Sequence, residues 1–135
     1  MATKFDTEIT VRPSDIDYNK HVHQSVYLDY LIFARVDQMK RCYKMSIEIF
    51  FNRGYSWATK STYIEFYKPV FMSEIVIVRT WVKEVKQKSV KVCFQFLKKG
   101  KQEIVAEGSA VYVLINAKTG KPEAIPEDVI KKYSI

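Results

Sequence analysis

The sequence predicts an α+β protein in which one long helix packs against a sheet of antiparallel strands. A single helical pattern runs over roughly residues 25–43, and its first part, residues 26–36, is apolar on almost every side. After Gly54, four segments rich in Val, Ile, Tyr, Phe and Thr follow one another, separated by short turns. One helix covered by one sheet makes two layers, which is the α+β arrangement. We expect one domain, residues 1–135, because this length is typical of a single domain.

The elements follow in a simple order. Residues 5–12 alternate in polarity and predict a first strand, which Pro13 ends before a polar loop and the helix. Short turns between the later strands predict antiparallel neighbours joined as a meander. Pro126 opens a short C-terminal helix that continues through residue 132. The four later strands are expected at residues 57–67, 74–85, 89–97 and 103–115.

The long helix also predicts self-association. A helix that is apolar almost all round must be enclosed by other structure. Five strands do not comfortably hide one of this length, so we expect a homo-oligomer, which would also protect strand edges. The later part of the helix is polar, and Asp37 and Arg41 are spaced for an i,i+4 ion pair.

Composition narrows the classes of function. The net charge of +7 is the only feature that favours nucleic acid, since glycine loops, zinc spacing and arginine-rich segments are all missing. The N-terminus lacks an apolar secretory run, and no stretch is long enough to span a bilayer. Cys42 and Cys93 lack metal-ligand spacing and predict reduced, buried thiols. We therefore expect a cytoplasmic protein with no metal, no cofactor, no nucleic-acid partner and no membrane insertion.

The residues best suited to chemistry lie just before the helix. Residues 15–23 contain two carboxylates, Asp15 and Asp17, and two imidazoles, His21 and His23. The N–H groups at a helix N-terminus suit a developing oxyanion, and a nearby carboxylate can attack a carbonyl or activate water. The residues alone leave a structural alternative open, in which the carboxylates accept turn amides and Ser25 caps the helix.

This segment resembles a known family. Asp15-x-Asp17-x-x-x-His21-Val22-His23-Gln24-x-Val26-Tyr27 is similar to the D-x-D-x-x-x-H-V-N-N-x-x-Y signature of the 4-hydroxybenzoyl-CoA thioesterase family. Further similarities follow in the family's order along nearly the whole chain: a strand that ends in a proline at residues 63–70, a turn at 83–89, and a proline-containing ending at 121–126. The chain departs from the pattern at Lys20, which replaces a frequent glycine, and at His23-Gln24, which replaces Asn-Asn.

The resemblance implies a hot-dog fold, with one long central helix wrapped by a five-stranded antiparallel sheet, and an acyl-CoA thioesterase activity. Asp17 falls on the catalytic carboxylate, as nucleophile or as general base for water. Gln24 falls at the helix start, where a backbone N–H would polarise the thioester carbonyl. His23 is a second candidate for that polarisation, whereas His21 is expected to support the loop.

The resemblance also implies a ligand and an assembly. Lys86, Lys88 and Ser89 fall on the turn where the family contacts coenzyme A, and the family forms dimers or tetramers of dimers. Glu65 is expected to be a paired or exposed strand carboxylate. Two alternatives remain open: an acyl-ACP thioesterase, whose acidic carrier would suit a basic surface, and a non-catalytic hot-dog module that binds acyl-CoA.

Overall fold

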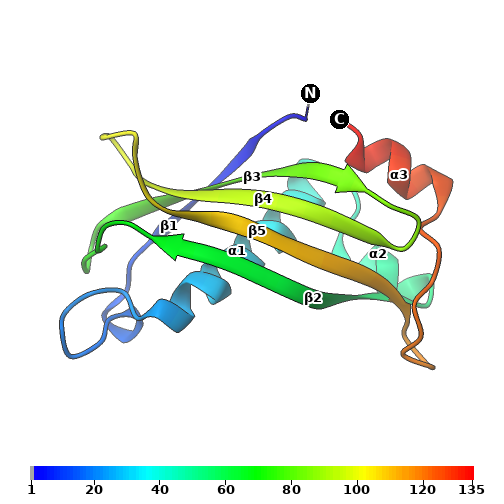
Figure 1. Ribbon diagram of the computed structural model, residues 1–135, viewed down its shortest axis with the longest axis horizontal. Helices are drawn as coiled ribbons and strands as arrows, with labels where there is room; N and C mark the ends of the chain where they lie inside the picture. Colours follow the sequence, from blue (N-terminus) through cyan, green and yellow to red (C-terminus); the bar gives the residue numbers. More distant parts are fainter. Residues whose placement is uncertain (1) are drawn as a thin grey trace.

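The computed structural model describes residues 2–135 and contains a curved five-stranded antiparallel sheet with a long helix across one face (Figure 1). The predicted helix and strands are confirmed to within a few residues, and a second short helix, which the sequence analysis missed, follows the first. The strands are β1 (Phe5–Thr10), β2 (Tyr55–Phe66), β3 (Ile75–Val85), β4 (Ser89–Lys98) and β5 (Glu103–Asn116). The helices are α1 (Gln24–Arg41), α2 (Ile47–Asn52) and α3 (Glu127–Tyr133), with a 3-10 turn at Pro13–Asp15.

The strand order is β1-β3-β4-β5-β2. The expected meander is confirmed for β3, β4 and β5, which are antiparallel neighbours in sequence order. Strand β2, however, pairs with β5 and not with β3, which follows it in the chain. The 12-residue β2 is therefore an edge strand, and its outer N–H and C=O groups have no strand beside them within this chain.

The core lies between α1 and the concave side of the sheet. Strand β4 alternates as its sequence predicts, and the side chains of Val90, Val92, Phe94 and Phe96 are all buried. Tyr27, Tyr30, Leu31 and Ala34 of α1 pack against this face in one cluster. A second cluster closes the other end of the sheet with side chains from α2 and α3, including Phe50, Val129 and Tyr133.

Helix α1 is not enclosed within a single chain, which agrees with the expectation that five strands do not hide a helix of this length. Leu28, Ile32, Phe33 and Val36 are 41–59% exposed and form one stripe along the helix. The reason is that the sheet covers only one side of α1, and the opposite side carries apolar residues with nothing packed on them. We refer to these four residues as the α1 stripe.

Polar contacts connect α1 to its surroundings. Asp37 and Arg41 form the expected i,i+4 ion pair at 2.9 Å. Gln38 is fully buried and donates to Thr7 of β1 at 3.0 Å, while Thr80 of β3 donates to Gln38. Cys42 and Cys93 are both free thiols. Both are half-buried, whereas full burial was expected. Within residues 2–135, no helix is both long and apolar enough to cross a membrane.

Candidate active site

Asp15 is a structural carboxylate that anchors the segment before α1. Its side chain is buried, with the residue 3% exposed, and accepts hydrogen bonds from Arg12 and from the Tyr30 hydroxyl at 2.7 Å. Burial raises the pKa of Asp15, but the hydrogen bonds from Arg12 and Tyr30 outweigh it and hold that pKa below its usual value. With its oxygens already occupied, Asp15 has no capacity left for chemistry.

Asp17 lies in a tight loop just beyond this anchor and is half-buried. Its Oδ1 accepts the backbone N–H groups of Asn19 at 2.9 Å and His21 at 3.3 Å, as the structural alternative required. Its Oδ2 has no hydrogen-bond partner among residues 2–135. The same carboxylate therefore holds the loop with one oxygen and leaves the other available.

Lys20 and His21 also stabilise the conformation of the Asp17 loop. Lys20 has a φ of +67°, in the left-handed region that favours glycine, and its N–H donates to the Asp17 carbonyl at 2.9 Å. The His21 ring packs edge-on against Phe71 with a centroid separation of 5.2 Å. These contacts agree with the expected loop-supporting role of His21.

The N-terminus of α1 begins one residue earlier than expected and is capped by His23, not by Ser25. The His23 Nδ1 accepts the Ser25 N–H at 3.1 Å, and the His23 N–H donates to the Asp15 carbonyl at 2.9 Å. Gln24 is the first helical residue, and its N–H has no acceptor within residues 2–135. A hydrogen-bond donor at the positive end of the helix dipole is therefore unoccupied.

A cleft of about 720 Å³ brings these groups together. Asp17, His23 and Gln24 all line it, so three of the residues singled out in the sequence share one site. The opposite wall comes from residues 66–69 at the end of β2, which the sequence analysis did not assign to the site. Burial raises the pKa of Tyr27, in the same cleft, to about 12, so its hydroxyl is neutral near pH 7.

The predicted coenzyme A residues lie elsewhere. Lys86, Lys88 and Ser89 form the turn between β3 and β4, where the Lys86 N–H donates to the Ser89 carbonyl at 2.8 Å. Strand β3 begins beside the Asp17 loop and has 11 residues, so this turn lies roughly 35 Å away at the other end of the sheet. Figure 1 shows the loop between β1 and α1 at one end of the molecule and this turn, beside α3, at the other. One chain does not bring the two groups together.

The remaining ionisable groups add no second catalytic constellation. Glu65 lies exposed on β2 and accepts the Tyr63 hydroxyl, as expected for a strand carboxylate. Among residues 2–135, no three His, Cys, Asp or Glu side chains are grouped so that they could hold a metal ion.

A long helix that crosses a five-stranded antiparallel sheet is the hot-dog fold. A family model described as the thioesterase-like superfamily matches residues 11–133, and the chain belongs to this superfamily. The narrower similarity to 4-hydroxybenzoyl-CoA thioesterases remains a hypothesis. A search of curated proteins found no match.

Solved structures support the fold. The DHNA-CoA thioesterase of Staphylococcus aureus is similar with a TM-score of 0.90 at 22% identity, covering 97% of this chain and 89% of that one. The hypothetical protein TT1821 of Thermus thermophilus reaches 0.88 at 27% identity, covering 98% and 96%. SAV2348 of S. aureus, solved in complex with CoA, reaches 0.86 at 17% identity, covering 98% and 82%. The chain is thus an α+β hot-dog protein and a thioester hydrolase.

Proposed function

We propose that this protein hydrolyses acyl-CoA thioesters and that Asp17 is its catalytic carboxylate. The observation that carries the proposal is the position of Asp17 and Gln24 in one cleft, one with an unoccupied carboxylate oxygen and the other with an unoccupied N–H. A hot-dog neighbour solved in complex with CoA supports a CoA-borne substrate.

The roles follow from the chemistry of a thioester. The Gln24 N–H and the helix dipole would stabilise negative charge on the carbonyl oxygen as it becomes tetrahedral. Asp17 either attacks the carbonyl carbon, giving a mixed anhydride that water then cleaves, or removes a proton from an attacking water. Both routes consume one water and release a carboxylic acid and the CoA thiol. The exposed His23 ring, whose Nδ1 is occupied by the cap, has only Nε2 left to offer a substrate.

We further propose that the complete site needs two copies of the chain. The turn that carries Lys86 and Lys88 lies roughly 35 Å from the Asp17 loop along the 11-residue β3, so a partner would have to supply it. Ile32 and Val36 of the α1 stripe line one cavity with Trp57 and Thr59 of β2, so the stripe and the unpaired edge strand offer an apolar surface and a strand edge for a symmetric dimer. The lysines would then bind the CoA phosphates from the second copy.

The first experiment compares wild type with Asp17→Asn on CoA thioesters of short, long and aromatic acids, and on the same acyl groups carried by acyl carrier protein. We expect kcat to fall at least 100-fold, because the variant keeps the side-chain shape but loses the base or nucleophile. Asp29→Asn is the matched control, since Asp29 is an exposed carboxylate on the first turns of α1 outside the cleft. Equal activity of Asp17→Asn and wild type would remove Asp17 from the mechanism, and absence of thiol release from every ester would overturn the enzyme assignment.

A single turnover in H₂¹⁸O separates the two chemical routes. Attack by Asp17 gives a mixed anhydride, and water that cleaves it at the Asp17 carbonyl carbon releases an unlabelled acid and leaves the label on the protein. General-base catalysis labels only the acid, so label on Asp17 identifies the nucleophilic route. Mass spectrometry of the acid and of the Asp17 peptide distinguishes them.

Mixing a variant without the carboxylate with a variant weakened in CoA binding tests the shared site. Asp17→Asn and the double variant Lys86→Ala/Lys88→Ala each lack one part, and a mixed dimer would contain one intact site. We expect activity at subsaturating substrate to recover on mixing after partial unfolding and refolding. No recovery, together with a monomer in sedimentation experiments, would place both parts in separate sites.

A further inference from the structure

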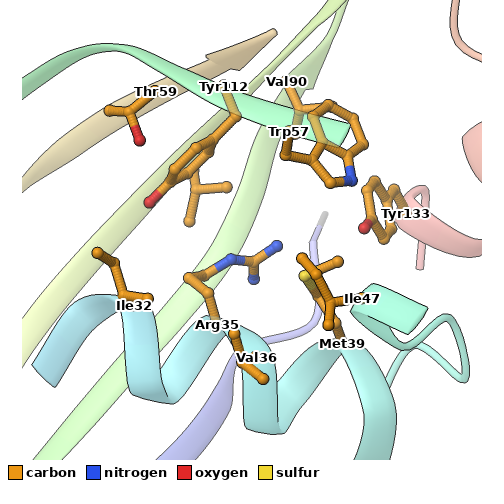
Figure 2. Close-up of a pocket in the computed structure, with 11 residues that line it drawn as sticks. Ile32, Arg35, Val36, Met39, Ile47, Trp57, Thr59, Val90, Tyr112 and Tyr133 are labelled. Carbon is orange, nitrogen blue, oxygen red and sulfur yellow. The ribbon is translucent and has the colours of Figure 1, made fainter. Parts of the chain in front are cut away.

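A second cavity lies further along α1 and is separate from the Asp17 cleft. It has a volume of about 180 Å³ and lies between α1, the start of β2 and the short helices α2 and α3 (Figure 2). Arg35 is 11 residues beyond Gln24, which places this cavity roughly 16 Å along the helix from the proposed oxyanion donor. None of the residues that line the Asp17 cleft lines this one.

The cavity is apolar except for a buried positive charge. Arg35 is 7% exposed, and Figure 2 shows its guanidinium extending from α1 into the space among Trp57, Tyr112 and Tyr133. Its recorded contacts are a 3.3 Å hydrogen bond from one nitrogen to the Thr80 hydroxyl and a position over the Tyr43 ring, 5.5 Å from the centroid. No carboxylate of residues 2–135 lies within 4.0 Å of it.

A buried guanidinium without a partner lowers the stability of the fold unless another group compensates its charge. A buried charge without a partner of opposite sign is destabilising, and a guanidinium has five N–H donors to satisfy. The Trp57 indole Nε1 is a further buried donor with no acceptor among residues 2–135. The Arg35 guanidinium thus lies at an apolar cavity, and none of the described side chains supplies an anion there.

We propose that this cavity binds an organic carboxylate whose apolar part is about the size of one aromatic ring. The guanidinium would hold the carboxylate in a two-point, charge-assisted contact. The apolar walls, including Ile32 and Val36, would cover the hydrocarbon part. A cavity near 150 Å³ is known to hold a benzene ring, so about 180 Å³ suits one ring with a short arm.

Two sources would supply this chemistry, and both rest on the proposed function. One is the free acid that thioester hydrolysis releases. The other is the acyl part of a thioester that carries a second carboxylate. In either case Arg35 distinguishes an anionic group from a neutral one of the same shape.

Calorimetric titration of the purified full chain with 3-phenylpropionate and with the neutral 3-phenylpropanamide tests the site directly. We expect the acid to bind at least about tenfold more tightly than the amide, as a charge-assisted contact to a buried guanidinium implies. In Arg35→Met this difference should disappear. Equal affinities in wild type, no binding of either compound, or a preference that persists in Arg35→Met would overturn the proposal.

Matched variants keep the result interpretable. Arg41→Met removes the same charge from the same helix at a position outside the cavity, and should retain the acid preference. Asp17→Asn alters only the other cleft and should leave the affinity for the acid unchanged; its loss there would refute the separate site. If Arg35→Met unfolds, Arg35→Lys keeps a positive charge but loses the planar fork of donors, and should weaken binding of the acid severalfold and of the amide little.

Hydrolysis assays then assign the source. Hexadecanedioyl-CoA and hexadecanoyl-CoA differ by a terminal carboxylate on acyl chains of equal length, long enough to span the roughly 16 Å between the Gln24 N–H and Arg35. A preference for hexadecanedioyl-CoA that Arg35→Met abolishes supports the acyl source, whereas equal rates, with acid binding intact, support the released acid. Hydrolysis of neither ester would count against the proposed function, while the titration would still decide the carboxylate site.

Discussion

The contact between Tyr30 and Asp15 gives a sharp test of what holds the segment before α1 in place. Tyr30→Phe removes one hydroxyl, which donates to the buried Asp15 Oδ2 at 2.7 Å. Asp15 keeps its hydrogen bonds from Arg12, so no acceptor is left empty and only the one bond is lost. A hydrogen bond to a charged buried group contributes about 1.5–3 kcal/mol.

That free energy corresponds to a measurable shift in melting temperature. For 135 residues the unfolding entropy is about 0.28 kcal/mol/K, so Tyr30→Phe should lower Tm by about 5–10 °C near pH 7. The effect depends on pH because the folded state lowers the pKa of Asp15. Such a group stabilises the fold above its unfolded pKa of about 3.9, and this stabilisation is lost as the pH falls through the lower folded value. The difference between Tyr30→Phe and wild type should therefore be full at pH 7 and shrink at pH 3.

Urea unfolding at both pH values, followed by far-UV circular dichroism, measures this difference. Tyr43→Phe is the matched control, because the Tyr43 hydroxyl is buried without a partner among residues 2–135 and its removal should be neutral or stabilising. A Tyr30→Phe variant as stable as Tyr43→Phe, or one that loses more stability at pH 3 than at pH 7, would refute the reasoning.

Two further variants test other parts of the molecule. Gly108→Ala should destabilise the fold by at least about 3 kcal/mol in urea unfolding, because a Cβ at that position would lie 1.8 Å from the Tyr63 carbonyl oxygen across the β2–β5 pair. Ser109→Ala, its neighbour, should change the stability by less than about 0.5 kcal/mol. Replacing Lys86 and Lys88 by alanine should raise KM for CoA esters by up to about fivefold per lysine at low salt and leave kcat unchanged. The same acyl group on N-acetylcysteamine, which has no phosphates, should show no change in KM; a lower kcat on both esters would contradict a phosphate-binding role.

Much of the fold could be predicted from hydrophobic periodicity, because the pattern of apolar residues in each element depends on which of its faces is buried. Strand β4 alternates so regularly that its buried face is readable from the sequence alone. The edge position of β2 was not readable in this way, since β2 and β3 carry similar residues and nothing local states which strand pairs with β5. Helix α2 was missed for a related reason: it has six residues, and its stability comes from burying Phe50 in the second cluster.

The candidate site likewise contains features that local sequence could predict and features that it could not. Asp17 and Gln24 are close in sequence, so a motif could place them in one cleft. The residues before α1 did not by themselves separate Asp15 from Asp17, because the environment of Asp15 depends on Tyr30, 15 residues away along the chain, as well as on Arg12. The structural alternative placed the cap at Ser25, since serine is a common cap and histidine is not, whereas the structure uses the His23 ring nitrogen.

Helix α1 explains why the sequence signals for fold and function overlap. A helix that is apolar on nearly every side looks like a buried core element, yet its three uses differ. Its first N–H groups face the Asp17 cleft, one side packs in the core and carries Arg35 into the second cavity, and the α1 stripe stays uncovered. The stripe touches the cavity at Ile32 and Val36, so a partner that covers one also encloses the other. Enclosure would strengthen the electrostatic attraction between Arg35 and an anion, because removing water lowers the effective dielectric constant around the charge. Assembly and carboxylate recognition would thus depend on the same turns of α1, whereas the proposed chemistry depends on its N-terminus.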